Sequence, residues 1–158
     1  MTKDVLISVK GIQFGTMADD EPLEVISPGE YFKKNGKHYI IYEEVTEGYE
    51  GTTLNTYQFQ DRSMELTKKG LVNVHMVFEE GRKNLTNYMT PYGTVFVGLK
   101  AHSVEVKEKE EEIKLEIQYD LEVNYEYLAH CNIYMSIVPR ERKNFLLQKE
   151  TKEKMDES

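Results

Sequence analysis

The sequence of 158 residues has no tryptophan, four prolines and one cysteine. Cys131 alone cannot form an internal disulfide, so the disulfide frameworks of small secreted domains are excluded. No apolar stretch is long enough to cross a bilayer, and none of signal-peptide length follows Met1. We therefore expect a cytoplasmic protein with a reduced thiol.

Recognisable catalytic motifs are also missing. The chain has no nucleophile elbow, no P-loop and no dinucleotide-binding glycine pattern before a helix. The sequence therefore predicts no cofactor and no catalytic residue, and an enzyme ranks behind binding and interaction proteins.

Positive charge is in short supply. Lysine and arginine number 20 against 28 acidic residues, which gives a formal net charge of −8. A surface that binds nucleic acid or an anionic membrane normally carries a basic stripe, and the basic residues here are not clustered. We expect neither nucleic acid nor a membrane as a partner.

What the chain does have is alternation. Between Glu112 and Val123 every odd position is apolar or aromatic and every even position is polar. Successive side chains of a strand point to opposite faces, so this stretch is predicted to be one long strand with a buried face and a wet face. Long strands need long partners that curl together, which indicates a barrel or a curved sandwich.

Turns and one phase shift divide the rest into further strands. Asn35-Gly36 lies between extended residues and is typical of a type I′ hairpin. Pro28-Gly29 is expected to interrupt the chain before a strand from Glu30 to Lys34, and Thr90-Pro91-Tyr92-Gly93 fits a type I turn. In the strand from Thr94 to Val106 the apolar positions change from odd to even near His102-Ser103, which predicts a β-bulge.

These strands define the predicted fold class. We expect an all-β protein, an antiparallel up-and-down β-barrel of about 8–10 strands, with a β-sandwich as the alternative. The barrel domain should span residues 1–139. Residues 140–158 form a charged C-terminal tail, in which Phe145, Leu146 and Leu147 could dock a short helix.

Several short segments, in one order, resemble a known family. They are Tyr39-Ile40-Ile41-Tyr42-Glu43-Glu44, Thr52-Thr53, Met64-Glu65-Leu66 before Gly70, Phe78 with Gly81, Thr90-Pro91-Tyr92-Gly93 and Tyr119-Asp120-Leu121. Together they look like the YwiB-like family of small uncharacterised proteins from Gram-positive bacteria, over roughly residues 3 to 138. The family resembles the calycins, which include lipocalins, so the resemblance implies a calycin-like or lipocalin-like barrel. It implies no established activity.

Four residues are the candidate ligand-binding site: Tyr42, Glu44, Tyr92 and His102. Tyr42 and Glu44 lie in the Tyr-Glu-Glu segment of the resemblance and Tyr92 in the Thr-Pro-Tyr-Gly segment, whereas His102 lies at the proposed bulge. Apolar pockets with a few convergent polar groups are the usual form of a small-molecule site. Ordinary packing of a turn and of strand tyrosines is the alternative. The inward face of the strand from His38 to Val45 stays open, because both faces are apolar.

No metal site is predicted. The chain has four histidines, His38, His75, His102 and His130, and no two of them have the close spacing that places two ligands on one ion. A site assembled across strands is the alternative, with His102 as its first candidate. Cys131 follows His130 directly, and strand alternation sends the two side chains apart.

The leading functional hypothesis is a barrel that binds a small apolar or amphiphilic ligand without transforming it. The competing hypothesis is a closed barrel that acts as a protein-interaction or assembly module. Barrels of about eight strands have room for side chains or for one small ligand, so the contents of the interior separate these hypotheses.

Overall fold

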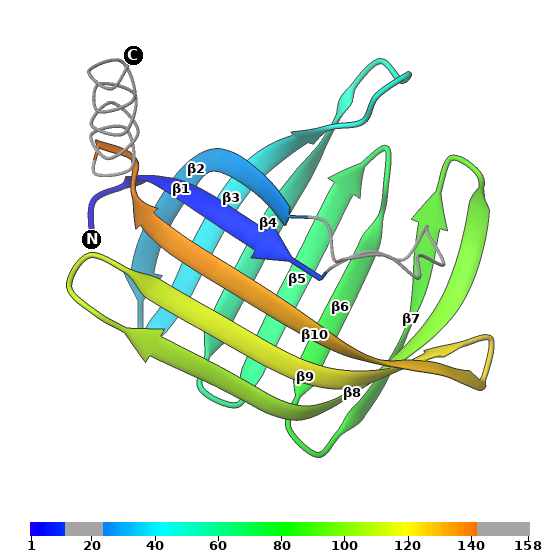
Figure 1. Ribbon diagram of the computed structural model, residues 1–158. Coiled ribbons are helices and arrows are strands. Elements are labelled where there is room, and N and C mark those ends of the chain that lie inside the picture. Colours follow the sequence, from blue (N-terminus) through cyan, green and yellow to red (C-terminus); the bar gives the residue numbers. More distant parts are fainter. Residues whose placement is uncertain (12–23, 142–158) are drawn as a thin grey trace, which may run out of the picture.

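A computed structural model describes residues 1–11 and 24–141, and these residues form ten strands (Figure 1). Their bounds are β1 Asp4–Lys10, β2 Glu24–Lys34, β3 Lys37–Val45, β4 Thr52–Gln60, β5 Ser63–Gly70, β6 Val74–Glu79, β7 Lys83–Thr90, β8 Gly93–Glu108, β9 Ile113–Val123 and β10 Glu126–Pro139. None of the described residues forms a helix long and apolar enough to cross a membrane.

All ten strands belong to one antiparallel sheet with the order β6-β5-β4-β3-β2-β1-β10-β9-β8-β7. Strands that lie side by side in the sheet are also consecutive in the chain, with one exception: the first strand, β1, pairs with the last, β10. The sheet curls until β6 and β7 meet, where the bridge between Asn73 and Met89 joins its two edges. The predicted all-β antiparallel barrel is confirmed, as a nearly closed one.

The long alternating strand is confirmed as β9. Its odd residues from Ile113 to Leu121 are buried, whereas Lys114 and Gln118 are exposed. Their buried side chains meet those of β10 and β1, where Ile133, Met135 and Ile7 lie in the same core. Because these strands contribute almost only apolar groups to the interior, with the Tyr119 hydroxyl as a polar one, burial of their inward faces is the main stabilising term on this side of the barrel.

The predicted bulge in β8 is confirmed as well. The register between β8 and β9 shifts between Ala101 and Ser103. The buried side chains change there from odd positions, as at Ala101, to an even position at Val104. Two turns close this end of the barrel against the bulged segment. The Arg62 amide donates to the Val104 carbonyl at 3.1 Å, and the Gly81 amide donates to the Ala101 carbonyl at 2.9 Å.

The hairpin at Asn35-Gly36 has the predicted backbone, with φ angles of 52° and 76°. The expected interruption at Pro28-Gly29 is wrong, because β2 runs through both residues. Pro28 pairs with Leu6 of β1, and β2 begins to pair with β3 only at Glu30. The missing amide hydrogen of Pro28 therefore costs no bond to β3, and β2 curves as it passes from β1 to β3 (Figure 1).

The chain turns from β9 into β10 at Asn124-Tyr125, where both φ angles are positive. On the inward face of β10, Ile133, Met135 and Ile137 are buried and Cys131 is partly buried. The predicted C-terminal helix and most of the charged tail lie outside the described residues, as does most of the loop between β1 and β2.

Candidate functional site

The interior changes character along β3, β4 and β5. The alternation of burial settles the inward face of β3, since His38, Ile40 and Tyr42 are buried and the next inward position is Glu44. On β4 and β5 the inward positions likewise become polar toward the loops at residues 46–51 and 71–73. This is the end opposite the turns that pack on β8. We call Tyr42, Glu44, Asn55, Tyr57, Lys68 and Tyr88 the interior polar cluster.

An ion pair lies at the centre of the interior polar cluster. Lys68 Nζ lies 2.8 Å from Glu44 Oε2, and the Asn55 side-chain amide donates to the same oxygen at 3.0 Å. The Lys68 side chain is buried, whereas that of Glu44 is 39% exposed. A buried ammonium needs a compensating charge, so Glu44 is the group that permits Lys68 to point inward.

The protonation of Glu44 follows from this arrangement. Burial raises the pKa of the carboxyl, but the hydrogen bond and charge of Lys68 and the hydrogen bond from Asn55 together outweigh burial and lower the pKa. Glu44 is therefore ionised at neutral pH and the pair has no net charge.

Asn55 is completely buried, and its two side-chain atoms differ in their partners. Nδ2 bonds to Glu44 and, at 3.4 Å, to the Thr53 carbonyl, whereas Oδ1 accepts no hydrogen bond from the described part of the chain. A buried acceptor without a partner costs about 1–3 kcal/mol. Asn55 Oδ1 is thus an acceptor that an internal ligand or water could satisfy.

The facing strand β7 is also polar inside. Asn84 pairs with Leu99 and Tyr88 with Val95, so both side chains point inward with these core residues. Among the described residues Asn84 Nδ2 is a buried donor that finds no acceptor. The inward face of β7 therefore offers polar atoms where β8 and β9 offer apolar ones.

Three tyrosines complete the interior polar cluster. The hydroxyls of Tyr42 and Tyr57 lie 3.1 Å apart, and their rings stack with centroids at 5.9 Å. Burial raises the pKa of Tyr42 to about 12 and that of Tyr57 well above its usual value. Burial, with the charge of Glu44, also raises the pKa of Tyr88, which brings β7 into the same electrostatic neighbourhood. All three are neutral hydrogen-bonding groups near pH 7.

The structure brings together two of the four residues singled out from the sequence. Tyr42 and Glu44 belong to the interior polar cluster. Tyr92 is 85% exposed and its ring meets the edge of Tyr49, and His102 lies on the outer face beside Asp120 and His130. A ligand role for these four residues remains a prediction. Asn55 and Lys68 were not identified from the sequence. Alternation puts Asn55 in phase with Tyr57 and Lys68 in phase with Leu66, but it does not show that both polar groups meet Glu44.

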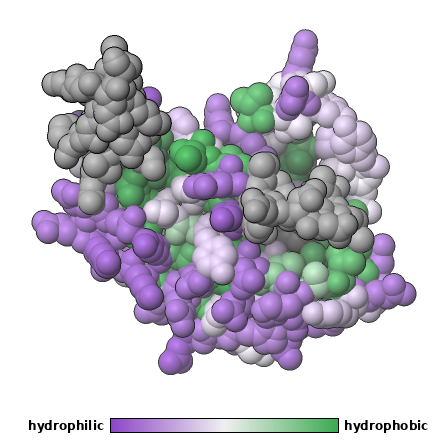
Figure 2. Space-filling model, in the orientation of Figure 1, coloured by the Kyte–Doolittle hydropathy of each residue, from purple (hydrophilic) through white to green (hydrophobic). Residues whose placement is uncertain are grey.

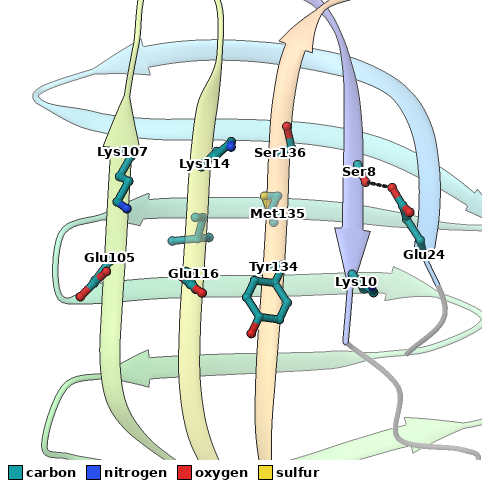
Figure 3. A pocket seen from close by; sticks show the side chains of 11 residues that line it. Ser8, Lys10, Glu24, Glu105, Lys107, Lys114, Glu116, Tyr134, Met135 and Ser136 are labelled. Atoms are coloured by element: carbon teal, nitrogen blue, oxygen red, sulfur yellow. Dashed lines mark hydrogen bonds between the residues drawn. The ribbon is translucent and has the colours of Figure 1, made fainter. Parts of the chain in front are cut away.

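A groove of about 720 Å³ lies on the outer face across β1, β10, β9 and β8 (Figure 3). Figure 2 shows hydrophilic residues over most of this face. Two cross-strand rows line the groove. One row is Ser8, Ser136, Lys114 and Lys107, and the other is Lys10, Tyr134, Glu116 and Glu105. Lys107 thus stands directly opposite Lys114, and Glu105 opposite Glu116. Like charges in such pairs are destabilising.

Fold and interior define a class: an antiparallel up-and-down barrel of ten strands with a polar region inside one end. Comparison with solved structures agrees. The crystal structure of the ywiB protein from Bacillus subtilis matches with a TM-score of 0.71 and 17% sequence identity, over 87% of this chain and 92% of that one. At this identity the likeness shows the fold alone.

The family follows from the sequence comparison. Residues 7–135 match the model of the family described as a domain of unknown function, DUF1934, and the chain belongs to this family. The resemblance to the uncharacterised YwiB-like proteins is confirmed by this match together with the structural one. No curated protein matches the chain.

Proposed function

We propose that the barrel binds a small, uncharged amphiphile at the interior polar cluster without transforming it. The observation that supports this most is the completely buried Asn55 side chain, whose Oδ1 accepts no hydrogen bond from the described residues. A polar group that burial leaves without a partner lowers stability, so a use for it in binding explains its presence.

The charges of the cluster indicate the chemical class of the ligand. Lys68 and Glu44 neutralise each other at 2.8 Å, so neither is available to a charged ligand without loss of the pair. Asn55 Oδ1 needs a donor. The apolar residues around the cluster, such as Leu66 and Met76, suit a hydrocarbon or aromatic body. We infer a mostly apolar molecule with at least one N–H or O–H group.

The side chains of the interior polar cluster suit binding rather than catalysis. Tyr42 and Tyr57 have raised pKa values and do not act as bases at neutral pH. Lys68 Nζ is paired with the Glu44 carboxylate at 2.8 Å, so it is not placed as a free nucleophile. A cytoplasmic site of action is part of the proposal, and the single free thiol of Cys131 is compatible with it.

The test uses N-phenyl-1-naphthylamine, an uncharged apolar dye whose fluorescence responds to its surroundings and which has a single N–H donor. We expect saturable binding of one dye per chain. Asn55→Leu should weaken binding about tenfold, which corresponds to the loss of one hydrogen bond. Tyr42→Ala should also change the binding, because Tyr42 lies in the same cluster.

The matched control is Asn87→Leu, the same change at an exposed position of β7. Dye binding should be unaffected by it, and circular dichroism should show that all variants are folded. Equal affinity of wild type and Asn55→Leu would contradict the proposal. So would an equal loss in Asn87→Leu, which would place the dye on the surface.

The groove supports a second candidate, a protein-interaction module. The observation that favours this candidate is that each row of the groove contains a pair of like charges. Lys107 stands opposite Lys114 in one row, and Glu105 stands opposite Glu116 in the other. A partner with complementary rows of charge would relieve both repulsions. Proteins retained from a bacterial extract by the wild type should then be lost from a variant carrying Lys107→Glu and Lys114→Glu. Retention unchanged in that variant would remove this candidate.

A further inference from the structure

Three side chains on the outer face of the barrel converge from three strands. His102 of β8 places Nε2 2.8 Å from Asp120 Oδ2, and His130 of β10 places Nδ1 3.0 Å from Asp120 Oδ1. One nitrogen or oxygen atom from each residue lies within 4.8 Å of the other two, and the two imidazole rings have centroids 5.5 Å apart. This group, which we call the outer His-Asp-His cluster, is separate from the interior polar cluster, because it lies on the opposite face of the sheet.

The sheet itself builds this convergence. His130 stands directly opposite Asp120 in the register of β9 and β10. On the other side Asp120 pairs with Lys100, and His102 reaches Asp120 because it is the extra residue between Ala101 and Ser103. Bulges re-aim side chains in this way. The backbone amides of Arg62 and Gly81 donate hydrogen bonds to carbonyls on either side of His102. These bonds hold the bulged segment of β8, and with it His102, in place.

We propose that His102, Asp120 and His130 form a binding site for a divalent transition-metal ion such as Zn²⁺. Two imidazole nitrogens and one carboxylate are ligands that zinc prefers, at about 2.0–2.2 Å from the ion. Two such ligands at the angles of a tetrahedral or octahedral site lie about 2.8–3.6 Å apart, by the same bond lengths. The two measured N–O distances already lie within this range.

A bound ion would use the ring nitrogen of each histidine that now faces Asp120. A neutral imidazole that binds in this way carries its hydrogen on the other ring nitrogen, which faces away from the ion. The rings have room to close on the ion, since the side chains of His102 and His130 are 44% and 46% exposed. Three protein ligands leave at least one coordination position for water. Lys100 stands opposite Asp120 in the register of β8 and β9, and its positive charge would oppose binding of a cation.

The test is isothermal titration of Zn²⁺ into the full chain after treatment with a chelator and buffer exchange. We expect one ion per chain. His102→Ala and His130→Ala should each weaken binding at least about tenfold, and Asp120→Asn, which keeps the shape of the side chain, should do the same. Absorption of bound Co²⁺ in the visible range provides a second readout, and it should be lost in the same three variants.

His75→Ala is the matched control, because His75 is also exposed on a strand and has one carboxylate partner, Glu65 at 3.4 Å, but no second histidine in its group. It should bind zinc as the wild type does. The proposal is overturned if the wild type takes up no zinc, or if His102→Ala and His130→Ala bind within about twofold of the wild type. An equal loss in His75→Ala would show binding scattered over the surface and would overturn it too.

Discussion

Two regions of the barrel interior follow the same geometric rule with opposite chemistry. On β1, on β9 from Ile113 to Leu121 and on β10 from Ile133 to Ile137, every second residue is buried and apolar or aromatic. On β3, β4 and β5 every second residue also points inward, but toward one end these residues are Glu44, Asn55 and Lys68. The first region stabilises the barrel by burial alone. The second contains polar groups that a closed hydrophobic interior does not need, which is why we propose a binding role for it.

The largest expected effect comes from placing a charge in the apolar region. Ile117 is completely buried at the centre of β9. Ile117→Asp should lower the free energy of unfolding by about 4 kcal/mol or more, because it leaves a carboxylate in the core without a cation to pair with. Urea unfolding followed by circular dichroism measures the loss.

The control is the next residue on the same strand. Gln118 is exposed, so Gln118→Asp should cost about 1 kcal/mol or less. Equal losses for Ile117→Asp and Gln118→Asp would mean that the two faces of β9 are not as different as the burial indicates.

This contrast also explains how much could be read from the sequence. The apolar region was predictable, since a period of two in apolar residues identifies both the strand and its buried face, as in Ile113 to Val123. The bulge at His102 was predictable for the same reason, because a change of phase is visible in the pattern. The number and length of such strands favoured a barrel and left a β-sandwich as the alternative.

The interior polar cluster could not be found in this way. Lys68 is in phase with Met64 and Leu66, so the alternation alone places it on the inward face. The pattern does not show what a lysine there pairs with, because its partner Glu44 is 24 residues away. The outer His-Asp-His cluster depends on the register of three strands, which single-sequence patterns do not supply. The turn at Asn124-Tyr125 was missed because tyrosine rarely adopts the positive φ that it has here.

A smaller effect is expected from removing the buried charge of the polar region. Lys68→Met keeps most of the side-chain volume and leaves Glu44 without its cation. Loss of one partner of a fully buried pair costs about 3–5 kcal/mol. Since the Glu44 side chain is 39% exposed and can be hydrated, we expect about 1–2 kcal/mol at pH 7. The exposed change Lys69→Met is the control and should cost less than about 0.5 kcal/mol.

The pH dependence gives this prediction a sign. The pKa of Glu44 is lower in the folded protein than its ordinary value of 4.5, so the pair stabilises the fold above that value, and the stabilisation is lost as the pH falls through the folded pKa. The difference in stability between wild type and Lys68→Met should therefore be largest near pH 7 and shrink below about pH 4.5. A difference that stays constant over this range would mean that packing of the Lys68 stem, rather than its charge, stabilises the fold.

The smallest effect on stability should come from Asn55→Leu, although this residue is completely buried. The change removes the hydrogen bond from Nδ2 to Glu44, which lowers stability. It also removes the buried Oδ1, which accepts no hydrogen bond from the described residues, and it adds apolar surface to the core, and both of these raise stability. The opposing terms are each about 1–3 kcal/mol, so we expect a net change within about 1 kcal/mol in either direction. Urea unfolding measures this change, and the dye titration on the same samples measures binding.

Nearly unchanged stability together with weakened binding would separate the polar region from the apolar one. In the apolar region the reverse change, Leu115→Asn, should destabilise the protein by about 2–5 kcal/mol. A loss above about 3 kcal/mol in Asn55→Leu would instead show that Asn55 is part of the framework of the barrel, since the Nδ2 bond to Glu44 would then outweigh everything that the leucine gains.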